Sequence, residues 1–225
     1  MRGVVFIASV LSHQIPLIME GETKIPVPSQ DIEEFKSVLG FARASYCFEG
    51  LIDWNCTTCN PELQTTDIYP VGNFDDNAFG FVAYSKPIES IVLSFRGTRN
   101  FKNWISDLRF AKPDCPFPEA PDNAKVHLGF LETWQFLKAD VLDALMTLYK
   151  KYPGSKLLLT GHSLGGAVAT LASADLYSSF PELVFREWRL ITVGQPRYGR
   201  SDFRVGNQEF SLWFEGFPFT MHRIM

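Results

Sequence analysis

The stretch KLLLTGHSLGGAVATLASADL, from Lys156 to Leu176, constrains the fold of this chain more than any other segment. An apolar run is followed by the motif G-H-S-L-G, centred on Ser163, and then by a segment rich in alanine. This order predicts a buried strand, a sharp turn at Ser163 and a helix. The two glycines leave room for the chain to fold back, so the serine hydroxyl would stand above the sheet. Ser163 is therefore the candidate nucleophile.

The periodicity of apolar residues elsewhere predicts an α/β protein. Helical spacing is found at residues 31–46, 131–151 and 165–180. Runs with strand character lie at residues 78–84, 90–96, 156–160 and 189–194. Strands that alternate with helices around Ser163 indicate a sheet with parallel central strands.

Acyl transfer at a serine also requires hydrogen-bond donors for the developing oxyanion. The backbone N–H of Leu164, directly after the serine, is the first candidate. The second is expected at the turn Arg96-Gly97-Thr98, where the N–H or hydroxyl of Thr98 would face the developing charge. Each such donor contributes roughly 2.7–4 kcal/mol to transition-state stabilisation.

The segment after this turn has one apolar stripe. Phe101, Trp104, Ile105 and Leu108 follow a helical spacing, with polar residues opposite. Two interpretations remain open. The stripe belongs either to a surface helix packed on the core or to a mobile lid that opens at an oil–water interface.

The N-terminus predicts export. Arg2 precedes the apolar run Val4 to Leu11, which is too short to span a bilayer but suits a secretory signal. A buried strand is the alternative. The polar, Pro-containing stretch 21–30 is typical of a pro-segment, so we expect a leader over 1–30 and a folded domain over 31–225. Secretion is the predicted localisation.

Cysteine spacing and charge restrict the partners. Cys56 and Cys59 are expected to form a small disulfide, and Asn55 begins a glycosylation sequon, which suits an exported loop. No second C-x-x-C or histidine pair completes a zinc site, so no metal is predicted. A net charge of −4 without a basic cluster argues against nucleic acid as a partner.

Four segments occur in the order seen in one family: IVLSFRGTRNFKNWISDLRF, KVHLGF, LLLTGHSLGGAVATLASADL and GQPR. They resemble the class 3 lipases, which are filamentous-fungal triacylglycerol lipases and their feruloyl-esterase relatives. The resemblance covers roughly residues 30–225. It implies an α/β-hydrolase fold with helices on both faces of a central, mostly parallel sheet, and ester hydrolysis without a metal or organic cofactor. It also implies Ser163 as nucleophile, Thr98 and Leu164 as oxyanion hole, and residues 101–107 as lid, with Trp104 at the position of the family's lid tryptophan.

The chain departs from the family after the sequence FTMHRIM. In the family, a loop of D-x-V-P type follows this strand and carries the catalytic aspartate, and the histidine lies later. The resemblance therefore implies a hydrolase domain that is incomplete at its C-terminus and lacks the triad acid and base. Asp202 and His222 come in a suitable chain order but are weak substitutes. The family's distal cysteine partner of Cys47 is also missing, so Cys47 and Cys115 are either paired with each other or free.

The sequence thus predicts a carboxylic ester hydrolase that acts through a serine nucleophile and an acyl-enzyme. Triacylglycerol lipase is the leading interpretation, with activity impaired by the missing acid and base. A feruloyl or other carboxylesterase is one alternative, and a truncated, non-catalytic or lipid-binding remnant is another. The expected partner is a lipid or ester substrate. Acyl-chain preference and oligomeric state are not indicated.

Overall fold

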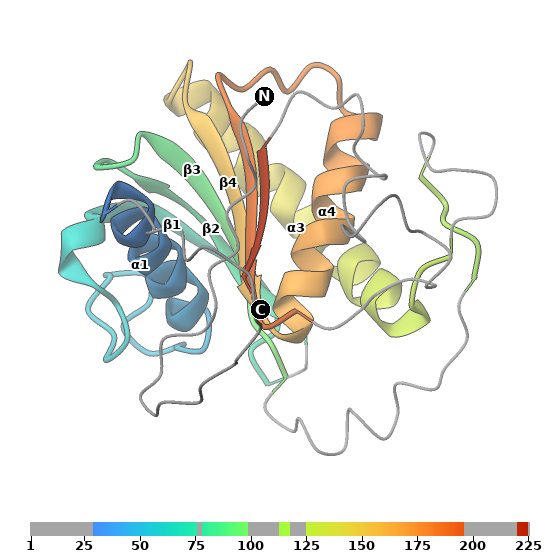
Figure 1. The fold of residues 1–225 in the computed structure, drawn as a ribbon, viewed down its shortest axis with the longest axis horizontal. Helices are drawn as coiled ribbons and strands as arrows, with labels where there is room; N and C mark the ends of the chain where they lie inside the picture. Colours follow the sequence, from blue (N-terminus) through green and yellow to red (C-terminus); the bar gives the residue numbers. More distant parts are fainter. Residues whose placement is uncertain (1–28, 76–77, 99–112, 118–124, 196–219, 225) are drawn as a thin grey trace, which may run out of the picture.

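A computed structural model describes residues 29–75, 78–98, 113–117, 125–195 and 220–224. Six strands form one sheet whose order in space follows the chain, β1-β2-β3-β4-β5-β6 (Figure 1). The strands are β1 (Thr65–Gly72), β2 (Phe79–Ser85), β3 (Ser90–Phe95), β4 (Lys156–His162), β5 (Trp188–Val193) and β6 (Thr220–Ile224). The helices are α1 (Ser29–Ala44), α3 (Leu128–Lys151), α4 (Leu164–Ser179) and the 3₁₀-helix η1 (Pro61–Leu63).

The sheet is mixed. Its first three strands are antiparallel neighbours, whereas β3, β4, β5 and β6 are parallel. Parallel neighbours need a crossover, and the crossover from β3 to β4 contains α3 while that from β4 to β5 contains α4. The predicted sheet with parallel central strands is confirmed.

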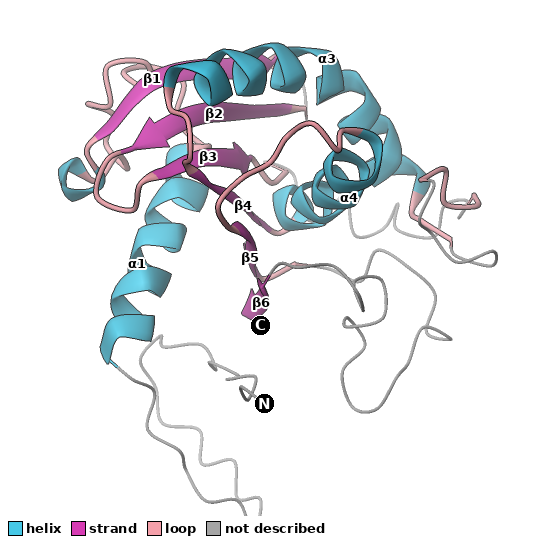
Figure 2. Cartoon of the chain, turned by 90° about the horizontal axis from the view of Figure 1, so that it is seen from above, coloured by secondary structure: helices cyan, strands magenta, loops and turns pink. Residues whose placement is uncertain are grey.

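Alternating side chains divide the interior into two cores. In β3, Ile91 and Leu93 face the core that α3 and α4 cover, whereas Val92 faces the core beneath α1. Figure 2 shows α1 on one side of the strands and α3 with α4 on the other. Because both faces are covered, the central strands are apolar throughout, as a parallel sheet in an α/β protein requires.

Helix α4 packs on β3, β4 and β5 beside α3, which covers β1 and β2, and α4 is buried on all sides. Every residue from Leu164 to Leu176 is buried. Its glycines and alanines keep the helix thin, so its backbone approaches β3, β4 and β5 closely. This close approach brings the start of α4 to the carboxyl ends of the parallel strands.

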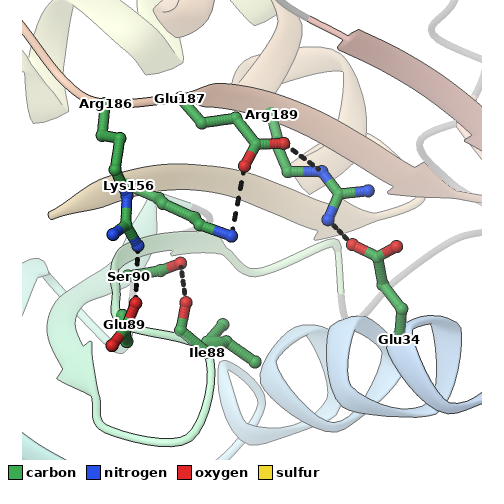
Figure 3. A network of polar contacts seen from close by, with 8 residues as sticks. All are labelled: Glu34, Ile88, Glu89, Ser90, Lys156, Arg186, Glu187 and Arg189. Carbon is green, nitrogen blue, oxygen red and sulfur yellow. Dashed lines mark hydrogen bonds and ion pairs between the residues drawn. The ribbon is translucent and has the colours of Figure 1, made fainter. Parts of the chain in front are cut away.

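A group of ion pairs lies near the amino ends of the parallel strands, at the end of the sheet away from Ser163 (Figure 3). Lys156, at the start of β4, pairs with Glu187 at 3.2 Å. Arg189 of β5 pairs with Glu187 and with Glu34 of α1. Arg186 reaches Glu89, in the turn between β2 and β3, at 2.6 Å. Solvent-accessible pairs of this kind stabilise little individually. Together they link α1, the turn between β2 and β3, β4 and the start of β5 at the strand ends away from Ser163.

Candidate active site

Ser163 occupies a strained turn between β4 and α4. Strand β4 ends at His162, α4 begins at Leu164, and the backbone of Ser163 between them has φ 56° and ψ −125°. A non-glycine residue at such dihedral angles costs of the order of 1–3 kcal/mol, and such strain is concentrated at functional sites. The predicted strand, sharp turn and helix are all present.

The glycines of the motif are required by close backbone contacts. A Cβ atom at Gly161 would lie 2.8 Å from the amide nitrogen of Gly166 and closer still to the carbonyl of Gly165. A Cβ atom at Gly165 would lie 2.7 Å from the carbonyl carbon of Phe95 and would overlap its oxygen. Strand β4, helix α4 and the end of β3 therefore touch through bare backbone at this point.

The turn after β3 packs against the serine turn. A Cβ atom at Gly97 would lie 2.6 Å from the carbonyl oxygen of His162. Arg96 holds this turn against Phe74 and Phe79. Its guanidinium is buried over the rings of Phe74 and Phe79, at 4.8 and 5.5 Å, and donates a 2.7 Å hydrogen bond to the Phe74 carbonyl. Thr98, the next residue but one, is buried beside this anchored backbone.

The hydroxyl of Ser163 is buried. The residue is only 4% exposed, and Oγ has no hydrogen-bond partner within the described part of the chain. The sequence predicts a hydroxyl raised above the sheet and does not indicate whether it is covered, so the burial of Ser163 is a finding of the structure. A buried polar atom without a partner costs roughly 1–3 kcal/mol. Catalytic groups are one class of such atoms in native structures.

Leu164 is the first residue of α4, and this position supplies a free donor. The first N–H groups of a helix have no acceptor within the helix, and they lie at its positive end. The N–H of Gly166 already donates to the carbonyl of Ser163, at 3.0 Å. The N–H of Leu164 thus remains suited to an anion formed at Ser163.

His162 and Tyr46 form a contact that the sequence did not indicate. The hydroxyl of Tyr46 lies 2.9 Å from Nδ1 of His162, so this histidine is engaged with the tyrosine. Partial burial of the imidazole lowers the pKa of His162 below 6.5. Tyr46 lies in a loop 116 positions away in sequence, and no local pattern marks it.

His222 is far from Ser163 along the sheet. It pairs with Ile191 of β5, which pairs with Thr160 of β4. Strands lie about 4.8 Å apart and rise about 3.3 Å per residue, so the two backbones are separated by roughly 10 Å across the sheet and roughly 10 Å along it. A general base must come within about 3 Å of the hydroxyl. This register agrees with the family resemblance, which puts His222 inside a strand.

Other predicted site residues lie outside the described part of the chain. They are Phe101, Trp104, Ile105 and Asp202, together with the side chain of His222. The expected leader also falls there, except that α1 already begins at Ser29.

The structure shows the bonding state of all four cysteines. Cys56 and Cys59 form the predicted disulfide, and Asn55 beside them is exposed. Cys47 and Cys115 are free thiols, which resolves the alternative that the sequence left open.

Within the described ranges, no three potential ligands gather into a metal site, and no helix is long and apolar enough to cross a membrane.

A sheet of this order, with a serine on a strained turn from a parallel strand into a helix, is typical of the α/β hydrolases. The chain belongs to the class 3 lipase family, because the family model described as "Lipase (class 3)" matches residues 92–225.

Individual relatives agree with this assignment. The chain is 32% identical over 222 residues to a lipase of Rhizopus niveus, which covers 95% of this chain and 54% of the relative. It is 34% identical over 187 residues to "Secreted mono- and diacylglycerol lipase 1" of Fusarium solani, covering 80% and 54%. The solved structure of lipase II from Rhizopus niveus superposes with a TM-score of 0.74 at 30% identity, covering 88% of this chain and 72% of that one. The chain spans about half the length of the curated relatives it matches.

Proposed function

We propose that this chain carries the nucleophile and oxyanion-binding groups of a secreted carboxylic ester hydrolase, a lipase that acts on acylglycerols. The names of the relatives support both the substrate class and secretion. The observation that carries the proposal is the state of Ser163. Three features suit a hydroxyl that awaits a substrate: the strained backbone of Ser163, its buried Oγ without a partner among the described residues, and the contact of the adjoining His162 with the turn that carries Thr98.

The proposed chemistry is acyl transfer through an acyl-enzyme. Oγ of Ser163 attacks the ester carbonyl carbon while its proton passes to a general base. The N–H of Leu164 and the N–H or hydroxyl of Thr98 hold the oxyanion. The carbon–oxygen bond to the alcohol then breaks, and the alcohol takes up the proton from the base. Water attacks the acyl-enzyme by the same route and releases the carboxylic acid. No step requires a metal or an organic cofactor.

The base and the acid are the open part of this proposal. A serine is a protonated alcohol at neutral pH and attacks poorly without a base. Loss of the histidine alone lowers turnover about 10⁶-fold in a well-studied serine hydrolase. Because Asp202 and His222 are weak substitutes, we propose that residues 1–225 alone turn over esters slowly. The apolar stripe that includes Trp104 is proposed to act as the lid at an oil–water interface.

Labelling with a serine-directed phosphonate tests the proposal without requiring fast turnover. The purified chain and its Ser163→Ala variant are treated with a fluorescent alkyl phosphonate, and the labelled residue is located by mass spectrometry. We expect covalent labelling at Ser163 in the parent and none in the variant. Circular dichroism of both proteins controls for folding. Equal labelling of the two folded proteins, or none in either, would contradict a nucleophilic Ser163.

Hydrolysis assays distinguish the substrate alternatives. Mono-, di- and triacylglycerols with short and long chains are compared with a feruloyl ester, again with Ser163→Ala as control. Serine-dependent release of fatty acid supports the lipase, and preference for the feruloyl ester supports the other carboxylesterase. Saturable binding of acylglycerol by both proteins without hydrolysis would favour the non-catalytic, lipid-binding alternative.

A further inference from the structure

Tyr46 connects the two segments that form the proposed oxyanion site. It lies in the turn that follows α1, which ends at Ala44. Its hydroxyl lies 2.9 Å from Nδ1 of His162, the last residue of β4. The same hydroxyl makes a hydrogen bond with the backbone of Gly97. One phenol therefore touches both the serine turn and the turn after β3.

The direction of these hydrogen bonds depends on the protonation states and on the histidine tautomer. The lowered pKa leaves His162 neutral at about pH 7, and in the tautomer that carries its proton on Nε2, Nδ1 accepts a hydrogen bond from the phenol. The backbone N–H of Gly97 has only the donor role, so it donates to the phenol oxygen. Burial raises the pKa of Tyr46 and outweighs the hydrogen bond from Gly97, so the hydroxyl stays protonated. The chain of donors runs from Gly97 through Tyr46 to His162.

The space around Tyr46 leaves little freedom to either turn. A Cβ atom at Gly97 would overlap the Tyr46 hydroxyl and would lie 2.6 Å from the His162 carbonyl oxygen. The rings of Tyr46 and His162 pack at 6.0 Å between centroids. Movement of the Gly97 backbone relative to His162 would break the hydrogen bonds or force the rings apart.

We propose that Tyr46 is a positioning residue, which fixes the turn of Thr98 relative to Ser163 so that donors from two separate segments meet at one oxyanion. The inference rests on the proposed function, and it deepens it by assigning a role outside the G-H-S-L-G motif. Tyr46 acts through Gly97 and His162. Its hydroxyl contacts His162 and Gly97, so the proposed role is neither that of the oxyanion donor nor that of the base.

The substitution Tyr46→Phe tests this role, because it removes the hydroxyl and keeps the ring. A misplacement of about 1 Å in an active site lowers the rate by about 10²-fold, so we expect phosphonate labelling of Ser163 and ester turnover to slow at least tenfold. KM should change little, because the phenol does not touch the substrate. The matched control is Tyr69→Phe on β1, whose hydroxyl has no hydrogen bond in the described part of the chain. It should label at the parent rate.

Amide exchange at Gly97 provides a readout that does not depend on catalysis. In Tyr46→Phe, the Gly97 N–H loses its acceptor, so its hydrogen exchange measured by NMR should accelerate while amides in α3 exchange as before. Unchanged exchange at Gly97 would overturn the proposed link. Faster exchange with an unchanged labelling rate would overturn the positioning role.

The two proposals fail in different ways. If the parent and Ser163→Ala are both unlabelled, the proposed function fails, and the exchange at Gly97 still decides whether Tyr46 holds the two turns together. If Tyr46→Phe slows labelling only in proportion to a lowered melting temperature, Tyr46 supports the fold and not the oxyanion site.

Discussion

Several positions around Ser163 require glycine, because backbone contacts there leave no space for a side chain. The clearest case is Gly165, whose missing Cβ allows the first turn of α4 to rest on the carbonyl of Phe95. The motif glycines are therefore explained by packing as well as by turn geometry. The position of Ser163 depends on the same contact.

We expect Gly165→Ala to be strongly destabilising. The new methyl group would overlap backbone atoms of Phe95 and Arg96, which cannot rotate away, so we expect a loss of about 3 kcal/mol or more in the free energy of unfolding. Urea denaturation followed by circular dichroism measures this loss. Gly129→Ala in the first turn of α3 is the control, because its nearest neighbour would lie at 3.4 Å. A comparable loss at both positions would mean that the Phe95 contact is not the cause.

Cys115 is expected to be an unreactive thiol. Burial raises its pKa to about 11, so little thiolate forms near neutral pH. Iodoacetamide should modify Cys115 slowly at about pH 8, and the rate should rise about tenfold per pH unit until the pKa is approached. Peptide mass spectrometry with time measures the rate. A plateau reached well below pH 11 would contradict the raised pKa.

The candidate site was predictable from the sequence only where the signal is local. Ser163, Leu164 and the turn at Gly97 belong to short motifs, because turn geometry and helix starts depend on adjacent residues. Tyr46 was missed because its partners are 116 and 51 positions away, and a tyrosine after a helix has no distinctive spacing. The burial of the Ser163 hydroxyl depends on tertiary packing and left no sequence pattern.

Secondary-structure elements meet around one buried polar group between α3 and α4. Asp175 of α4 is 4% exposed and accepts a 2.7 Å hydrogen bond from the indole nitrogen of Trp134. The same oxygen, Oδ2, pairs with Lys138 at 2.7 Å, and Oδ1 accepts a hydrogen bond from Ser179. This network orients α3 on α4, and α4 in turn carries the serine turn.

Removing this carboxylate should loosen the two helices. Asp175→Ala leaves the buried indole N–H of Trp134 without its acceptor, so we expect a loss of roughly 1–3 kcal/mol in the free energy of unfolding. Thermal and urea denaturation provide the measurement. Asp143→Ala on the exposed face of α3 is the control and should change stability by less than about 0.5 kcal/mol. An effect of Asp175→Ala no larger than that of the control would show that the network does not stabilise the packing.

The elements that the sequence predicted are those with strong periodicity. Helix α3 repeats apolar residues over many turns, and β4 is an unbroken apolar run, so each was identifiable alone. Strand β1 was not predicted. It contains Pro70 and a register shift near Asp67, which has positive φ, and these features remove the regular alternation of an edge strand. Strand β6 was expected from the family resemblance alone.

Acid should destabilise the whole molecule in two steps. The pKa of His162 is lowered by burial, so below pH 6.5 the unfolded chain binds a proton that the folded chain does not, and stability falls. Hydrogen bonds from Lys151 and Tyr152 lower the pKa of Asp67, so its contribution is present above pH 3.8 and is lost as the pH falls further. Melting temperatures across this range test both steps. His162→Gln should remove the first step and Asp67→Asn the second, and a profile unchanged by either variant would contradict the assignment.

At the scale of the whole molecule, the acid and base that would complete a catalytic triad with Ser163 have not been located. The family resemblance places them in a D-x-V-P loop and a later histidine, while the chain matches about half the length of its curated relatives. Sequencing the transcript beyond the codon for Met225 tests whether such a loop and histidine are encoded in frame. If both are encoded, Ser163 has its usual partners, and if neither is, the non-catalytic alternative is favoured.

The sheet order has a consequence for how the protein forms during translation. Since each described strand pairs with the one made just before it, the emerging chain can extend the sheet from a single growing edge, without inserting a late strand between two early ones. The turn after β3 is synthesised long before the serine turn, and it can therefore serve as a finished surface onto which the start of α4 folds as it leaves the ribosome.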